Sequence, residues 1–250
     1  VGSSLLPGAL DLWVGVRTSD AAPVLQGNYA GGLVQFRNGR IDGLTSGYVE
    51  FTADAEGALS QLSLVAHAAY IDDVNRRFVA EAGKYQVAAN GTGTLEFPES
   101  FGYAAGVRNL FVSPGGEVVM GIPKAPDAGL LVMVKRAPDT STISWNGVFR
   151  IAELTAANSF EFNPAAARLA AAVGYLKADG GGNAYLAQRL RTETGVSHLL
   201  AHNSYLLGFT GAGNLLSRAQ PKLLNMGITA RPMVFAGAQI GAEGELTLEH

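Results

Sequence analysis

The sequence contains no cysteine, which excludes disulfide bonds, thiolate metal sites and cysteine nucleophiles. Charge is also scarce: Asp, Glu, Lys and Arg make up 16% of the chain, and the formal net charge is −3. The 18 lysines and arginines are spread along the chain, so they do not form the dense basic face that nucleic-acid binding requires. No segment approaches about 18 consecutive strongly apolar residues, and the sequence therefore predicts no transmembrane helix.

Motifs of familiar enzyme chemistry are missing as well. The serine-containing segments LTSGY and VSPGG do not match the nucleophile elbow of serine hydrolases. The glycine runs GAGN and GGGN are not followed by the Lys-Ser/Thr pair of a phosphate-binding loop. We therefore expect no catalytic residues, no cofactor and a non-enzymatic protein.

What the sequence does contain is glycine, with 32 residues, and short runs in which apolar residues alternate. In LDLWVGVR at 10–17, the residues Leu10, Leu12, Val14 and Val16 fall on one face of a strand. Asn-Gly and Asp-Gly pairs in ANGTG and ADGGGN are typical of tight hairpin turns. Runs of this kind, spaced by roughly 8–12 residues, predict an antiparallel sandwich or barrel.

Several of these segments occur twice, in the same order, about 120 residues apart. KYQVAANGTGTLEF at 84–97 aligns with SYLLGFTGAGNLLS at 204–217, and LDLWVGVR at 10–17 aligns with LLVMVKR at 130–136. FTADAEGAL at 51–59 likewise has a counterpart in LKADGGGNA at 176–184. We interpret the chain as two tandem copies, residues 1–119 and 120–247, followed by a tag-like remnant at 248–250.

The duplication also bears on secondary structure and closure. The alanine-rich segment 164–179 favours a helix by propensity, but its counterpart GRIDGLTSGYVEFTAD favours a strand, so we expect strand in both copies. With about six strands per copy, one barrel closed from two halves leaves no exposed sheet edge, and we favour that arrangement. Two separate small barrels are the alternative.

Three further segments carry a family resemblance. The residues around Gly27 and Tyr29, the FTADAEG block and the GKYQV…GTGTL block resemble the G-x-Y … F-x-A-D-G-x-G … G-x-Y-x-V … G-x-G-T-L pattern of uncharacterised calycin-like (lipocalin-like) β modules of exported bacterial proteins. The second copy departs from the pattern, with Ser204 in place of Lys84 and Asn214 in place of Thr94. The resemblance implies a calycin-like antiparallel β-barrel and export. It brings no catalytic residues.

The sequence contains candidate residues for a metal site and for a general acid, but their spacing and surroundings favour neither. His198 and His202 have the spacing of a helical zinc pair, but on a strand they lie roughly 13 Å apart. Asp54 and Asp179 stand in glycine-rich turns with too few carboxylates for a calcium shell. The Asp-Asp pair at 72–73 is typical of a solvated turn rather than of a general acid. We expect no metal site.

Large aromatic residues are the candidate ligand-binding residues, because barrels of this type hold apolar molecules at their mouth. Repeated aromatic positions are also typical of a core that two copies share, and both interpretations stay open. The six candidates are Trp13, Tyr29, Tyr85, Trp145, Phe149 and Tyr205.

These patterns lead to two functional hypotheses. The first is an exported, non-enzymatic β-barrel protein that binds a small apolar ligand or serves as an envelope scaffold. The second is a surface or adhesion module in which exposed loops bind a partner and the barrel is support. The beginning of the sequence, VGSSLLPGALDLWVGVR, lacks a basic n-region and a cleavage site, so we expect the export signal to lie upstream of it. A barrel-type enzyme and an outer-membrane barrel are further alternatives, the latter with short strands for a membrane span.

Overall fold

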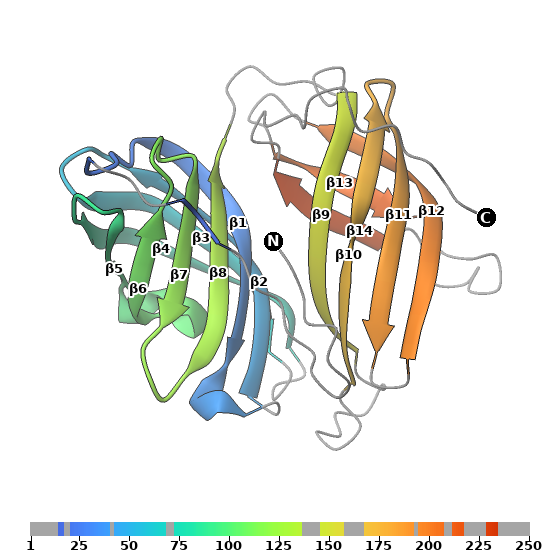
Figure 1. Cartoon of the computed structure of the whole chain (residues 1–250). Helices are drawn as coiled ribbons and strands as arrows, with labels where there is room; N and C mark the ends of the chain where they lie inside the picture. Colours follow the sequence, from blue (N-terminus) through green and yellow to red (C-terminus); the bar gives the residue numbers. More distant parts are fainter. Residues whose placement is uncertain are drawn as a thin grey trace. The chain divides into compact units, whose positions relative to one another are not determined.

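The computed structural model describes residues 15–17, 21–40, 43–68, 73–136, 146–157, 168–192, 195–207, 212–217 and 229–234 (Figure 1). These ranges are dominated by antiparallel β-strands, so the all-β prediction is confirmed. The chain divides into two compact units, Val16–Arg136 and the combination of Val1–Gly15 with Ala137–His250. In the ranges given above, no helix is long and apolar enough to cross a membrane.

The first unit is a closed barrel of eight strands in which every strand pairs with its sequence neighbours. The last strand returns to pair with the first, from Tyr29 opposite Lys135 to Phe36 opposite Ala128. This ring leaves no sheet edge exposed. The strands are β1 (Gly27–Phe36), β2 (Leu44–Ala53), β3 (Ala58–Ala68), β4 (Asp73–Val87), β5 (Thr92–Phe97), β6 (Gly106–Val112), β7 (Val118–Pro123) and β8 (Ala128–Lys135), with 3-10 segments at η1 (Arg37–Gly39) and η3 (Glu99–Ala104).

A bulge in β3 bends the sheet toward closure. Gln61 has a positive φ of 52°, and the pairing between β2 and β3 shifts by one residue there. An extra residue on one strand increases the local twist, which a sheet needs in order to curl into a barrel. Beyond the bulge, Leu62 and Leu64 again point into the interior and are fully buried.

The second unit contains a six-stranded antiparallel sheet in the order β14-β13-β12-β11-β10-β9. Its strand β10 covers most of the alanine-rich segment at 164–179, so the expected strand is confirmed for residues 168–179, whereas 164–167 lie outside the described residues. The strands are β9 (Asn146–Ala157), β10 (Arg168–Asp179), β11 (Asn183–Thr192), β12 (Gly195–Leu207), β13 (Ala212–Ser217) and β14 (Thr229–Val234).

Barrel closure differs from the single barrel that the sequence analysis favoured. The hydrogen-bonded ring closes within residues 27–135, and no strand of the sheet β9–β14 takes part in it. The expected boundary between residues 119 and 120 falls inside β7, which pairs with both β6 and β8 of the ring. The reason is that the segment 128–135, assigned by sequence to the start of the second copy, supplies the strand that satisfies the free edge of β1.

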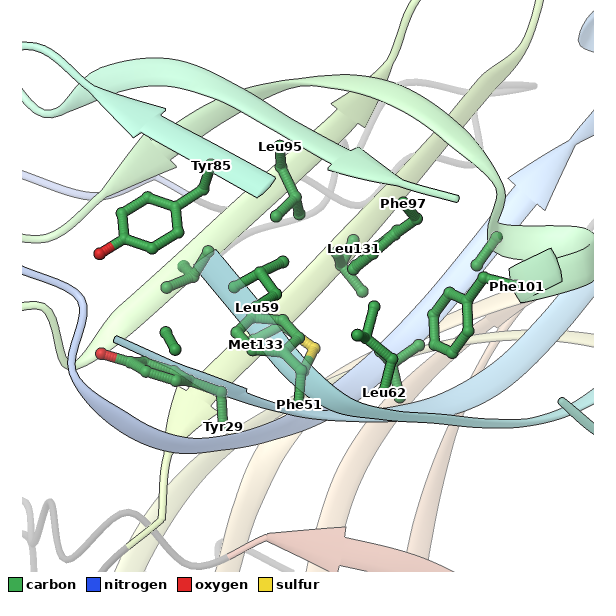
Figure 2. Close-up of a cluster of buried hydrophobic side chains, with 14 of the residues drawn as sticks. Tyr29, Phe51, Leu59, Leu62, Tyr85, Leu95, Phe97, Phe101, Leu131 and Met133 are labelled. Atoms are coloured by element: carbon green, nitrogen blue, oxygen red, sulfur yellow. The ribbon is translucent and has the colours of Figure 1, made fainter. Parts of the chain in front are cut away.

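The interior of the barrel is filled with large apolar side chains (Figure 2). Tyr29 stacks on Phe51 with ring centroids 5.5 Å apart, and Phe97 lies 4.9 Å from Phe101. Figure 2 shows Leu62 beside Phe51 and Phe101, whereas the ring of Tyr29 points to the opposite end of the cluster. An eight-stranded barrel is just wide enough for its own side chains to fill it. The core further includes Leu25, Leu33, Val49, Leu59, Leu64, Tyr85, Leu95, Leu110, Val112, Val119, Leu131 and Met133.

Turns in the two units share one construction. In the β2–β3 turn, Oδ1 of Asp54 accepts hydrogen bonds from the backbone N–H groups of Glu56 and Ala58, at 3.0 and 2.7 Å. In the β10–β11 turn, Oδ1 of Asp179 accepts them from the N–H groups of Gly181 and Asn183, at 2.7 and 3.0 Å. An aspartate that accepts backbone hydrogen bonds two and four residues ahead stabilises a tight turn.

Candidate functional site

The predicted ligand-binding residues Tyr29 and Tyr85 belong to the packed core of the barrel. The hydroxyl of Tyr29 donates to the carbonyl oxygen of Gly116 at 2.8 Å, and burial raises the pKa of Tyr29 to about 12. The hydroxyl of Tyr85 lies against the carbonyl oxygens of Leu25, at 2.9 Å, and of Asp54. Figure 2 shows both hydroxyls at the same end of the cluster. They therefore fasten the segment before β1 and two turns to the barrel.

The other predicted aromatics lie in the second unit or outside the described residues. Phe149 is half-buried on β9 and stands opposite Leu176 of β10, as Tyr29 stands opposite Phe51 in the barrel. Tyr205 pairs with Leu215, and its side chain is outside the described part of the structure. Trp13 and Trp145 lie outside the described residues.

Potential ligands for metal ions do not converge in the described ranges. No group of three His, Asp or Glu side chains there has the geometry of a metal site. His198 and His202 lie on strand β12, opposite Arg189 and Tyr185 respectively. Asp73 begins β4 opposite Ala68, whereas residue 72 lies outside the described residues. The carboxylates of Asp54 and Asp179 are occupied by the turns that they stabilise.

A groove of mixed polar and apolar lining, which the sequence analysis did not predict, lies on the outer face of β4, β5 and β6. It has a volume of about 570 Å³, and the residues that line it come from these three strands and the turn between β4 and β5. Gln86 stands opposite Thr94, and Thr94 stands opposite Asn109, so an amide, a hydroxyl and an amide form one row across the strands. Neighbouring strands lie roughly 4.8 Å apart, which sets the spacing of the row. Phe111, half-buried, lies in the neighbouring row opposite Thr92.

Close backbone approach at Gly93 fixes the position of this groove. A Cβ atom added to Gly93 would lie 1.8 Å from the carbonyl oxygen of Gln86, so no other residue fits without moving β4 and β5 apart. The adjoining turn is fastened by Asn90, whose Oδ1 accepts hydrogen bonds from the N–H of Thr92 at 3.1 Å and from its hydroxyl at 2.8 Å. These contacts hold β4, β5 and the turn between them together beside the groove.

Unused hydrogen-bonding groups face outward from this groove. Gln86 and Asn109 are exposed, and within the described part of the chain their side-chain amides have no hydrogen-bond partner. Each primary amide offers two donors and one acceptor oxygen. The groove thus presents neutral polar groups beside one aromatic ring, and it carries no catalytic pair of a nucleophile and a base.

A second polar feature is a set of three hydrogen-bonded side chains, and one of them, Arg108, is buried in the barrel. Arg108 is 1% exposed, and its guanidinium donates to Oε1 of Gln35 at 2.8 Å and to the carbonyl oxygen of Ala104 in η3. Nε2 of Gln35 donates in turn to Oδ2 of Asp127 at 2.8 Å. The guanidinium also lies 5.2 Å from the ring centroid of Phe97, a cation–π distance.

Burial and a neighbouring negative charge shift the pKa of Arg108 in opposite directions. Burial lowers the pKa of Arg108 to about 10, while the negative charge of Asp127 raises it. Gly121 makes room for the side chain, because a Cβ there would lie 3.1 Å from Cδ of Arg108. Because each of these hydrogen bonds joins two protein groups, we interpret their role as structural. They hold η3 and the loop around residue 127 against the barrel.

Comparisons of the chain with protein-family models, with curated proteins and with solved structures gave no match.

Proposed function

We propose that the protein is a non-enzymatic recognition module of an exported bacterial protein, in which the barrel is a rigid support and the groove on β4–β6 binds the partner. The observation that carries this proposal is the contrast between a filled interior and an open groove, lined by polar and apolar groups, on the same barrel. A filled barrel has no space for the apolar ligand of the first hypothesis. Export rests on the resemblance to calycin-like modules.

Groove chemistry favours a neutral ligand rich in hydroxyl groups, such as a saccharide chain. The row of Gln86, Thr94 and Asn109 supplies both donors and acceptors without a net charge. Phe111 supplies an aromatic surface for the C–H groups of a sugar ring. A ligand of this kind binds by several modest hydrogen bonds, each worth about 0.5–1.5 kcal/mol.

A saccharide array probed with the full chain tests the proposal, together with the double variant Gln86→Ala/Asn109→Ala. We expect one class of oligosaccharide to be retained, and the double variant to bind it at least about tenfold more weakly, which corresponds to about 1.4 kcal/mol. The matched control is Ser46→Ala/Ser60→Ala, which changes two exposed residues of β2 and β3. Equal binding by the groove variant and the control, or no retention of any saccharide, would contradict the proposal.

We also propose that the two units arose by duplication of one calycin-like unit. Its support is the register: Ala53 opposite Leu59 in the barrel corresponds to Ala178 opposite Ala184 in the sheet. In the same way, the pairing of Tyr85 with Leu95 corresponds to that of Tyr205 with Leu215. The order of neighbouring strands in β9–β14 also matches that in β1–β6, which supports the proposal.

A small apolar ligand remains a second candidate, now for the second unit. Three alanines, Ala172, Ala178 and Ala184, are among the buried residues of its sheet, together with Leu176 and Gln188. Native mass spectrometry of the full chain, purified without detergent, is the test. A stoichiometric small molecule that organic extraction releases would support a carrier. A clean apo mass with no uptake of a hydrophobic dye would contradict this second candidate.

A further inference from the structure

The sheet of the second unit has a buried face and an exposed face. Leu176 and Ala184 are buried, and because side chains alternate along a strand, the residues next to them on β10 and β11 point the other way. Large apolar side chains are exposed on that other face of β10, β11 and β12. They are Tyr175 at 42%, Tyr185 at 49%, Val196 at 47% and Leu200 at 67%.

The register brings three of these side chains together. Leu200 stands opposite Ala187, and Ala187 stands opposite Tyr175, so these residues form one row across the strands. Tyr185 lies two residues from Ala187 along β11, which makes it a diagonal neighbour of Tyr175 and of Leu200. Diagonal neighbours lie roughly 7–8 Å apart, within reach of large side chains. Tyr175, Tyr185 and Leu200 thus form an apolar cluster, and contiguous exposed apolar groups are typical of an interaction surface.

Positive charge flanks the apolar cluster. Lys177 is exposed opposite Tyr185, and Arg189 is exposed four residues farther along β11. The two charged positions are therefore roughly 13 Å apart, one on each side of the row that contains Tyr175. Among the exposed side chains that the structure describes on β10–β12, the one carboxylate belongs to Asp179, and hydrogen bonds of the turn engage it. The face is thus basic, although the formal net charge of the chain is −3.

The barrel has a different surface at the same distance from its aspartate turn. Two residues before that aspartate, Thr52 stands opposite Ser60. At the same place in the sheet, Lys177 stands opposite Tyr185. A basic and an aromatic side chain thus take the place of two small hydroxyl side chains, while the turns are built alike. Because the turns do not require this difference, it points to a partner of the exposed face.

We propose that this face of β10–β12 docks on an anionic lipid surface. Lys177 and Arg189 meet the phosphate groups, since an anionic leaflet attracts basic groups that lie close to it. Tyrosine rings suit the headgroup region because they have an apolar body and a polar end, and Leu200 reaches the acyl boundary. The inference goes beyond the proposed function and is independent of it, because the saccharide groove lies on the barrel.

Other partners fit this face less well. A second copy of the same face would place like charges against one another, because a symmetric contact pairs a surface with itself. Two cations are fewer than the dense basic face that a nucleic acid requires. An acidic polysaccharide matches the cations but offers no apolar phase to Val196 and Leu200, whereas a bilayer does.

Vesicle co-sedimentation of the full chain tests the proposal, with mixed phosphatidylglycerol and phosphatidylcholine vesicles and with phosphatidylcholine alone. The test variant is Lys177→Glu/Arg189→Glu. The matched control, Lys84→Glu/Lys124→Glu, makes the same change in net charge at two exposed residues of the barrel. We expect binding to the anionic vesicles that weakens as salt is added, and at least about tenfold weaker binding by the test variant than by the control.

The apolar contribution has its own pair of variants. Leu200→Ala shortens the most exposed side chain of the cluster, and we expect it to weaken binding to anionic vesicles about threefold or more. Val79→Ala is the matched control, since Val79 is a 62% exposed residue of barrel strand β4. Both residues are exposed, so we expect both variants to fold. Equal binding by the two would overturn a lipid surface as the partner, because a purely ionic contact does not use Leu200.

The vesicle experiment has further outcomes that would overturn the proposal. They are absence of binding to anionic vesicles, equal binding to neutral vesicles, and equal binding by the charge-reversal variant and its control. Retention on dextran sulfate without binding to anionic vesicles would also overturn it and identify an acidic polysaccharide as the partner. Oligosaccharide binding by the same samples tests the barrel groove separately, so failure of one site is distinguished from failure of the other.

A spin-labelled lipid identifies the docking face in the unmodified chain. With the label on the headgroup of an anionic lipid in nanodiscs, we expect the NMR amide signals of Tyr175, Tyr185 and Leu200 to broaden more strongly than those of the barrel. Stronger broadening of the barrel amides would overturn the proposal.

Discussion

In the barrel, Val49, Phe51 and Leu59 occupy register positions that Gly174, Leu176 and Ala184 occupy in the sheet β9–β14. The pairing with the preceding strand is the same, since Val49 stands opposite Gly31 and Gly174 opposite Ile151, and the aspartate turns are built alike. The pairing with the following strand differs by one residue, because β3 has a bulge and β11 has none. The barrel fills its interior with rings and branched chains, whereas the buried residues of the described part of the sheet are three alanines with Leu176 and Gln188. Turn chemistry and the pairing with the preceding strand can therefore persist while the volume of the inward-facing residues changes.

The largest expected effect comes from removing a ring from the filled barrel. Phe51 is 2% exposed and lies against Tyr29 and Phe97, so Phe51→Ala leaves a cavity and destabilises the barrel by about 3–5 kcal/mol. Leu176→Ala, at the corresponding position of the sheet, removes less volume and is expected to cost clearly less. Calorimetry with residue-resolved hydrogen exchange separates the two units. Equal losses for both variants would show that the two interiors are equally filled.

The next effect concerns the buried hydrogen bonds of Arg108, for which the described part of the sheet shows no counterpart. Arg108→Met keeps most of the volume but leaves Oε1 of Gln35 and the carbonyl oxygen of Ala104 without their donor. Unsatisfied buried acceptors cost about 1–3 kcal/mol, and we expect a loss of stability of that size in the barrel alone. The double variant Arg108→Met/Gln35→Leu should recover part of it. Chemical denaturation is the measurement. An unchanged midpoint for Arg108→Met would show that the hydrogen bonds of Arg108 do not stabilise the barrel.

A smaller effect is expected from adding volume to the sheet. Ala184→Leu introduces the residue that the barrel has at Leu59. If the buried face of β9–β14 is loosely filled, this change costs less than about 1 kcal/mol, whereas a tightly packed face loses about 1–3 kcal/mol. The reverse change, Leu59→Ala, serves as the matched control in the barrel and is expected to cost about 2–5 kcal/mol. Similar costs for both changes would contradict the comparison.

The smallest expected effect is a shift in the pKa of one carboxyl group. Hydrogen bonds from the side chain and the backbone N–H of Asn183 hold the pKa of Asp179 below its ordinary value. Because the pKa is lowered in the folded state, the turn is stabilised above the ordinary carboxyl pKa and loses that stabilisation as the pH falls through the lowered value. NMR titration of the carboxyl carbon should give a higher midpoint in Asn183→Ala than in the unmodified chain. An unchanged midpoint would mean that Asn183 does not hold the carboxylate.

Local patterns in the sequence account for much of the fold. Alternation within FTADAEGAL and the aspartate before glycine predict a hairpin, and the structure has one there, between β2 and β3. The strand at 168–179 was predictable only by comparison with its counterpart, because alanine propensity alone favours a helix. Closure of the barrel within residues 27–135 was not predicted, because it depends on which distant edge β8 meets.

The candidate site depended on long-range register and was therefore missed. No sequence pattern marks Gln86, Thr94 and Asn109 as a site, because each is a single outward-facing polar residue of its own strand. Only the pairing of β4 with β5 and of β5 with β6 places them in one row. Tyr29 and Tyr85 were predicted as ligand-binding residues and lie in the packed core, because the sequence pattern does not distinguish a core ring from a ring that lines a cavity.

The most direct test of the account is chemical-shift mapping of the isotope-labelled full chain by NMR, with an oligosaccharide panel and with an apolar probe. A filled barrel with an outer binding groove predicts that saccharide shifts the side-chain amide signals of Gln86 and Asn109 while the methyl groups of Leu62, Leu95 and Leu131 stay unchanged with either ligand. Dose-dependent shifts of those interior methyl groups on addition of the apolar probe would contradict it, and would make the barrel itself the carrier.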